Sequence, residues 1–108
     1  MIDYLVNENE TVNLYMEFLD EMGEPTIPIE VRWKAEDVMS GTILQDWQLL
    51  NVVGNTYVLT IPSDVCSIIN NANRIELKRI TIKTTLSASA IIMSEINIRV
   101  RNLGGVTQ

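Results

Sequence analysis

The stretch TVNLYMEFL, residues 11–19, places an apolar side chain at every second position: Val12, Leu14, Met16 and Phe18. Alternation with period two indicates a β-strand that buries one face. The same pattern recurs five more times before the chain ends. The apolar positions of the later runs are Ile29, Val31 and Trp33, then Tyr57, Leu59 and Ile61, then Ile75 and Leu77, then Ile80 and Ile82, and finally Ile96, Ile98 and Val100. The sequence therefore predicts an all-β protein.

Turn-forming residues separate these runs, with Gly and Pro at 23–25, Ser-Gly at 40–41 and Gly-Asn at 54–55. Residues 62–64 resemble a helix start, and the apolar residues of 65–69 are spaced for one face of a single helical turn. Short strands at this spacing predict an immunoglobulin-like Greek-key β-sandwich of about seven strands with one short helical turn. A jelly roll or a small barrel is the alternative.

A length of 108 residues is typical of one domain with one core. We expect an N-terminal arm or edge strand over residues 1–9, the sandwich over 10–103, and a flexible tail over 104–108. The first ten residues lack the basic and apolar regions of a secretion signal, and we find no membrane segment.

One run breaks the alternation. Ile75 and Leu77 are in phase with each other, but Ile80 and Ile82 follow one position late. If all four side chains point inward, one extra residue must be accommodated at Lys78 or Arg79. The pattern therefore predicts a β-bulge there, which would restore the inward phase.

The residues that most enzymes need are missing from this sequence. It contains no His and one cysteine, Cys66, so a Ser/His/Asp or Cys/His catalytic set is excluded. The sequence has no glycine-rich phosphate loop and no alternating acidic calcium loop, and its carboxylate clusters read as solvated turns. We predict a protein that is not an enzyme, has no cofactor and no metal site, and keeps Cys66 as a buried structural thiol.

Charge is distributed unevenly along the chain. Residues 1–54 contain 11 acidic and 2 basic residues, whereas residues 55–108 contain 3 and 6. All eight basic residues fall on three strands, 27–35, 74–84 and 93–102, which share a sheet in an immunoglobulin-like fold. Alternation predicts that the bases point outward, either as an ordinary solvated face between Glu30, Glu76 and Glu95 or as a contact surface. The candidate contacts are Arg32, Lys34, Lys78, Arg99 and Arg101, together with Ile2, Tyr4 and Leu5 of the arm.

Two aromatic residues could serve different purposes. Trp33 alternates with apolar neighbours and is predicted to lie in the core. Trp47 lies in a less regular region, where a core position and an exposed ligand-binding ring are equally compatible with the pattern. The second option supports an alternative function, a carbohydrate- or receptor-binding module. A net charge of −6 argues against nucleic acid as a partner.

Several segments together carry a family resemblance. They are RW at 32–33, SGTIL at 40–44, LTIP at 59–62, the strand 74–84 and IRVRNL at 98–103. In this combination the chain resembles small immunoglobulin-like virion proteins of tailed bacteriophages. The resemblance implies a structural module that docks onto capsid or tail subunits, or onto copies of itself as a homo-oligomer, and that is located in the virion. It supplies no site residues.

Overall fold

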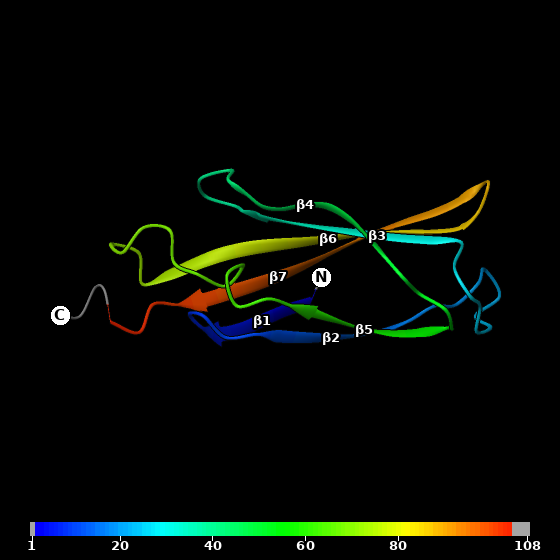
Figure 1. Cartoon of the computed structure of the whole chain (residues 1–108), viewed down its shortest axis with the longest axis horizontal. Helices are drawn as coiled ribbons and strands as arrows, with labels where there is room; N and C mark the ends of the chain where they lie inside the picture. The colour runs from blue at the N-terminus through cyan, green and yellow to red at the C-terminus, as the bar shows by residue number, and fades with distance from the viewer. Residues whose placement is uncertain (1, 105–108) are drawn as a thin grey trace.

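The computed structural model describes residues 2–104 as seven strands in two sheets (Figure 1). The strands are β1 (Ile2–Asn7), β2 (Val12–Glu17), β3 (Glu30–Asp37), β4 (Ile43–Leu50), β5 (Thr56–Ile61), β6 (Ile75–Ser87) and β7 (Ala90–Arg101). Over this range the architecture is the predicted immunoglobulin-like sandwich, and the sheets do not close into a barrel. None of the described residues forms a helix able to cross a membrane.

The two sheets differ in size. The large sheet has the strand order β1-β7-β6-β3-β4, and the small one pairs β2 with β5. All pairings are antiparallel except that of β1, which runs parallel to β7 with Ile2 opposite Ile96 and Asn7 opposite Arg101. The predicted grouping of the three base-carrying strands in one sheet is therefore confirmed by β3, β6 and β7.

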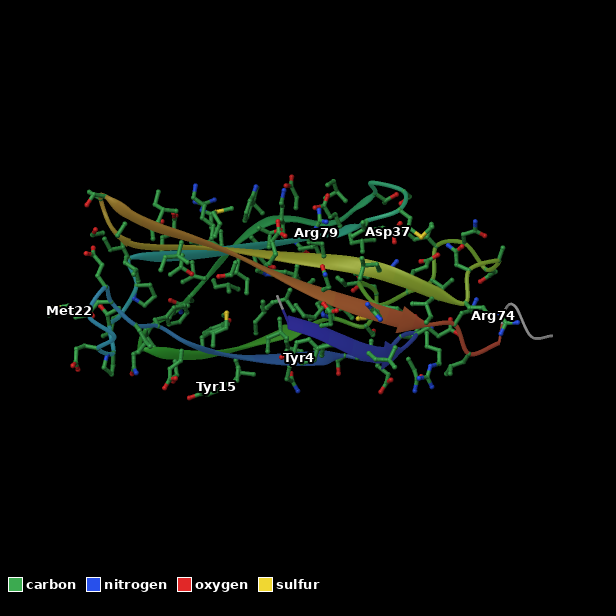
Figure 2. All side chains as sticks on the ribbon, turned by 180° about the vertical axis from the view of Figure 1, so that it is seen from behind. Tyr4, Tyr15, Met22, Asp37, Arg74 and Arg79 are labelled. Atoms are coloured by element: carbon green, nitrogen blue, oxygen red, sulfur yellow. The ribbon has the colours of Figure 1, made fainter. Side chains whose placement is uncertain are left out.

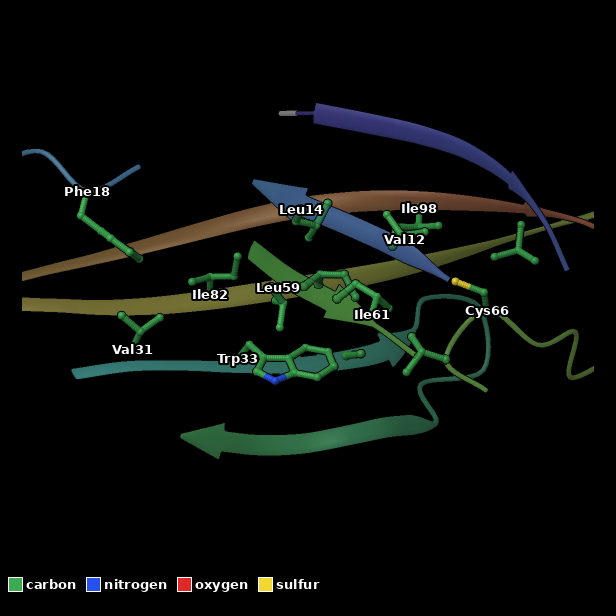
Figure 3. Packing of buried hydrophobic residues seen from close by; sticks show 14 residues of the cluster. Val12, Leu14, Phe18, Val31, Trp33, Leu59, Ile61, Cys66, Ile82 and Ile98 are labelled. Atoms are coloured by element: carbon green, nitrogen blue, oxygen red, sulfur yellow. The ribbon is translucent and has the colours of Figure 1, made fainter. Parts of the chain in front are cut away.

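The core lies between the two sheets (Figure 3). Alternate residues of β2 and β5 face alternate residues of β3, β6 and β7 across it. Trp33 is buried, as predicted, and its indole Nε1 donates a hydrogen bond to Gln48 Oε1 at 3.2 Å. Cys66 is also buried, and it packs against the end of this core.

The predicted bulge in β6 is wrong. Lys78 pairs with Asp37 on one side and Ile98 on the other, and Arg79 pairs with Glu36 and Asn97, without a register shift. The inward positions are Glu76, Lys78, Ile80 and Ile82, whereas Ile75 is exposed and Leu77 only half-buried. The phase expected from the apolar residues failed because two charged side chains occupy inward positions.

Smaller differences concern the ends of the elements. β3 begins at Glu30, so Ile29, which we expected on its inward face, is 70% exposed. The predicted helical turn is a series of tight turns, with backbone hydrogen bonds from Val65, Cys66 and Ser67 to residues three positions earlier. Of the predicted tail, residues 105–108 lie outside the described residues.

The β6–β7 hairpin is longer than the small sheet that covers it. Its strands have 13 and 12 residues, against six in each of β2 and β5. The tip of the hairpin and the loop after β2 consequently lie at the same end of an elongated molecule of 52 × 22 × 21 Å (Figure 1). That loop turns at Gly23, whose φ of 80° favours glycine, and the Asp20 carboxylate accepts hydrogen bonds from the backbone of Met22 and Glu24.

Candidate functional site

The outer face of the large sheet carries Arg32 and Lys34 from β3, as predicted. Carboxylates lie between the bases. Arg32 Nη2 is 2.9 Å from Glu30 Oε1, and the Arg79 guanidinium lies 3.7 Å from Glu36 and 3.9 Å from Glu95. This face therefore has mixed charge, and its exposed pairs contribute little to stability.

The arm residues singled out from the sequence belong to β1. Tyr4 packs against the core opposite Ile98, and Leu5 is exposed opposite Arg99. The Arg99 guanidinium is 3.7 Å from the Asp3 carboxylate, and Arg101 is exposed. The backbone of Ile2 pairs with Ile96. The structure thus places this group along one edge of the large sheet, and their role as partner contacts stays a prediction.

Lys78 was predicted to point outward, and this is wrong. Its side chain is fully buried, with Nζ 2.9 Å from Asp37 Oδ1 and 2.8 Å from Glu76 Oε1. The two carboxylates are also buried, at 3% and 2% exposure. Asp37 is the cross-strand neighbour of Lys78, and Glu76 lies two residues before it on the same face of β6. We call these three residues the ionic cluster.

Every carboxylate oxygen of the ionic cluster accepts a hydrogen bond. Ser40 donates to Asp37 Oδ2 from its backbone N–H at 2.9 Å and from its hydroxyl at 2.6 Å. Glu76 accepts from the backbone N–H groups of Ile69 and Asn70, both at 2.8 Å, and from the Asn73 side chain at 2.9 Å. The cluster therefore joins β3 and β6 to the two loops that follow β3 and β5.

These contacts determine the protonation of the two acids. Burial alone would raise the pKa of the Asp37 carboxyl, but hydrogen bonds from Ser40 and Lys78 outweigh burial and hold the pKa below its ordinary value. Burial opposes ionisation of Glu76 in the same way, and Lys78 and the two backbone N–H groups lower its pKa. Nearby, burial raises the pKa of the Cys66 thiol, which makes it a poor nucleophile.

The opposite end of the molecule carries an exposed apolar edge. β1 begins opposite Ile96, so within residues 2–104 no strand lies beside the outer edge of residues 90–95 of β7. Ile91, Ile92 and Met93 are 54%, 47% and 56% exposed there. We call residues 90–95 the open edge. An unprotected edge strand with three consecutive apolar residues is unusual in a soluble protein, because it presents unpaired backbone groups together with apolar surface.

A groove runs along the inner side of the open edge, between β2 and the β6–β7 hairpin. Its volume is about 380 Å³. Its apolar lining comes from β2 and the residues just after it, from β6 and from β7, and includes Met16, Phe18, Ile82, Leu86, Ile92 and Ile96. Within the described residues β2 pairs with β5 alone, so the far wall of the groove is also a strand edge. The groove thus separates two sheet edges that do not meet.

Acidic side chains surround this groove. Glu17 and Glu95 are part of its lining, and Asp20, Glu21 and Glu24 are exposed on the adjoining loop. Residues 84–94 of the hairpin contain no charged residue. Figure 2 shows the loop residue Met22 at this end of the molecule and Asp37 and Arg74 toward the other. The groove end is therefore apolar with an acidic rim, and Lys83, which pairs with Met93, lies on the outer face of the sheet, away from the groove.

Trp47, the candidate ligand-binding aromatic residue, lies on the outer face of β4 and is 37% exposed. Lys34 Nζ lies 5.1 Å from the centre of its ring, a cation–π contact that occupies one face of the indole. A shallow pocket beside it is lined by Glu30, Arg32 and Lys83. Trp47 is therefore outside the core, and its role as a ligand-binding residue stays a prediction.

Sequence reasoning missed both the ionic cluster and the open edge, although each left a signal. Four apolar residues in a row, AIIM at 90–93, do not alternate with polar residues and indicate a strand with two apolar faces. The pattern Glu76-Leu77-Lys78 made the inward phase of its strand ambiguous. We resolved that ambiguity with a bulge, because apolar residues are far more often buried than charged ones.

Comparisons with known proteins support the fold. No family model and no curated protein matches the chain. Among solved structures, the crystal structure of the periplasmic chaperone SfaE matches with a TM-score of 0.65 and 15% sequence identity. The match covers 94% of this chain and 55% of the SfaE chain, so this chain spans about half the length of that protein.

These findings correct the function expected from the sequence. The interpretation as a phage virion module is wrong, because a solved structure that shares this fold is that of a periplasmic chaperone. The likeness gives no support to the carbohydrate-binding alternative either. The immunoglobulin-like sandwich itself stands.

Proposed function

We propose that this chain is a protein-binding module that accepts an extended segment of another protein as an added strand along the open edge. The observation that carries the proposal is the combination of an unpaired strand edge with an apolar groove beneath it. Strand addition uses both features, because main-chain hydrogen bonds supply affinity while alternate side chains fill the adjoining pockets.

The groove also indicates the chemistry of the partner segment. An added strand would place every second side chain between Met16 and Ile92, where apolar residues fit. Its ends would pass Glu17 and the acidic loop, so Lys or Arg at the flanks is favoured, whereas Glu95 already has the Arg79 guanidinium 3.9 Å away. The partner we propose is thus an extended, alternating apolar segment with basic flanks. SfaE, which has this fold, is a chaperone, and a protein-binding role is consistent with that likeness.

The test uses displayed peptides of about eight residues, long enough to pair along the open edge. We expect selected binders to alternate apolar residues and to carry Lys or Arg near their ends. N-methylation of single peptide residues should abolish binding at every second position and have little effect at the positions between. The reason is that alternate backbone N–H groups of an added strand point at the edge. Binding that tolerates N-methylation throughout would contradict strand addition.

Variants of the protein locate the binding site. Ile92→Asp puts a carboxylate into the apolar groove beside two acidic residues and should weaken binding at least about tenfold. Ile75→Asp is the matched control, because Ile75 is an exposed isoleucine at the opposite end of the same hairpin, where it pairs with Arg101. Equal loss in both variants would place the binding site elsewhere. A dimer formed through the open edge, detected as a mass that depends on protein concentration, would identify a second copy as the occupant instead.

A further inference from the structure

The geometry of the ionic cluster points to a covalent bond: we propose that Lys78 and Asp37 condense within the folded chain to form an amide that links β6 to β3. Three groups suited to amide formation meet in a site closed to bulk water: an amine, a carboxyl and a second carboxylate in contact with the amine. The proposed function uses none of them.

The reacting atoms are already close. Nζ of Lys78 is 2.9 Å from Oδ1 of Asp37, and the carbon to be attacked, Cγ, is one bond beyond that oxygen. Nζ therefore lies within about 4 Å of Cγ, near the separation of about 3–3.5 Å from which such attacks begin. Because the two residues are direct cross-strand partners, the backbone holds them in register and little motion is needed.

Ser40 completes the site. Its backbone N–H and its hydroxyl both donate to Oδ2 of Asp37, at 2.9 and 2.6 Å. In the condensation Oδ2 becomes the amide oxygen, and negative charge develops on it in the tetrahedral intermediate. Two fixed donors at that atom stabilise the charge as an oxyanion hole does. Oδ1, the oxygen that contacts Lys78, is the one that leaves.

Glu76 is suited to move protons. Its Oε1 is 2.8 Å from Nζ, and donors from the loop after β5 fix its position. One proton passes from the Lys78 ammonium to Oδ1 of Asp37, which leaves a neutral amine able to attack and a neutral acid. The amine attacks Cγ, Glu76 takes the second amine proton, and it returns that proton to the departing hydroxyl.

The step balances without any other reactant. One carbon–nitrogen bond forms, one carbon–oxygen bond breaks, a water molecule leaves, and Glu76 ends as it began. No oxidant or reductant is involved. A pocket of about 250 Å³, lined in part by Asp37, Ser40 and Glu76, adjoins the site and provides room for the water to depart. The product removes one buried ion pair and ties two neighbouring strands together.

Mass spectrometry of the denatured, intact chain tests the proposal. We expect a mass lower than that of the sequence by one water molecule, and resistance to trypsin after Lys78. Digestion should yield a branched peptide that joins the segment containing Asp37 to the one containing Lys78. A chain of full mass after prolonged incubation in the folded state would overturn the proposal, and so would water loss located at any other pair of residues.

Two variants assign the roles. Lys78→Arg keeps a positive charge without a primary amine and should retain full mass. Glu76→Gln keeps the shape of the proton carrier without its basicity and should slow the loss of water by at least about a hundredfold. Bond formation at the wild-type rate in Glu76→Gln would remove Glu76 from the step. Should either variant fail to fold, the mass and branched peptide of the wild-type chain still decide whether the bond forms.

Discussion

Replacement of Lys78 by Met is the perturbation that best tests the ionic cluster. Met keeps most of the apolar stem of the side chain but removes the cation between Asp37 and Glu76, both almost fully buried. Removing one partner of a buried ion pair leaves an uncompensated charge and costs about 3–5 kcal/mol. Here two carboxylates lose their shared cation, so the upper part of that range is expected.

That cost can be converted into a melting temperature. An unfolding entropy of about 2.1 cal/mol/K per residue gives about 0.23 kcal/mol/K for 108 residues, so a loss of about 4–5 kcal/mol should lower Tm by about 18–22 °C. If the amide has formed in the wild-type chain, the substitution removes a cross-link instead of a cation, a loss of typically about 2–4 kcal/mol. Lys83→Met is the matched control, because Lys83 is a half-exposed residue on the outer face of the same strand. It should change stability by less than about 0.5 kcal/mol.

Urea unfolding followed by circular dichroism at several pH values distinguishes charge from cross-link. In Lys78→Met the unpaired carboxylates are favoured in their protonated form, so the variant should recover part of its lost stability as pH falls from 7 to 4. Loss of a cross-link alone has no such pH dependence. A loss below about 1 kcal/mol at pH 7, or a loss that does not change with pH, would refute our account of the cluster as a buried ionic group.

The remaining predictions concern acid stability, the core and the open edge. The pKa of Glu76 in the folded protein lies below its ordinary 4.5, so the stability that this group contributes is complete above pH 4.5 and is lost as pH falls through the folded pKa. Glu76→Gln should therefore reduce the fall of the unfolding midpoint at acid pH. Trp33→Ala should cost about 3–5 kcal/mol in chemical denaturation, since it empties the centre of the core. Met93→Lys, on the exposed side of the open edge, should leave stability within about 0.5 kcal/mol while it reduces aggregation measured by light scattering.

The strands could be predicted from the sequence because each of them buries one face. Val12 and Leu14 on β2, and Leu59 and Ile61 on β5, alternate with exposed residues and are buried as expected. The assignment of Trp33 to the core follows from the same rule. The sequence shows less clearly where a strand begins. β7 begins at Ala90, three residues before the predicted start at Met93, because alternation stops in this region.

The wrong phase predicted for β6 has one physical origin, which is that period two reports burial only when buried side chains are apolar. In β6 the inward phase runs through Glu76 and Lys78, and nothing local to that strand shows that Asp37 lies opposite to neutralise them. The pairing is set by register between segments about 40 residues apart, which a pattern within one strand does not contain. A sequence signal does exist at the level of the pair, since an inward charge on one strand requires an opposite inward charge on its neighbour. Asp37 continues the inward phase of Val31, Trp33 and Ala35, so this test, applied to both strands together, would have selected the unbroken register over the bulge.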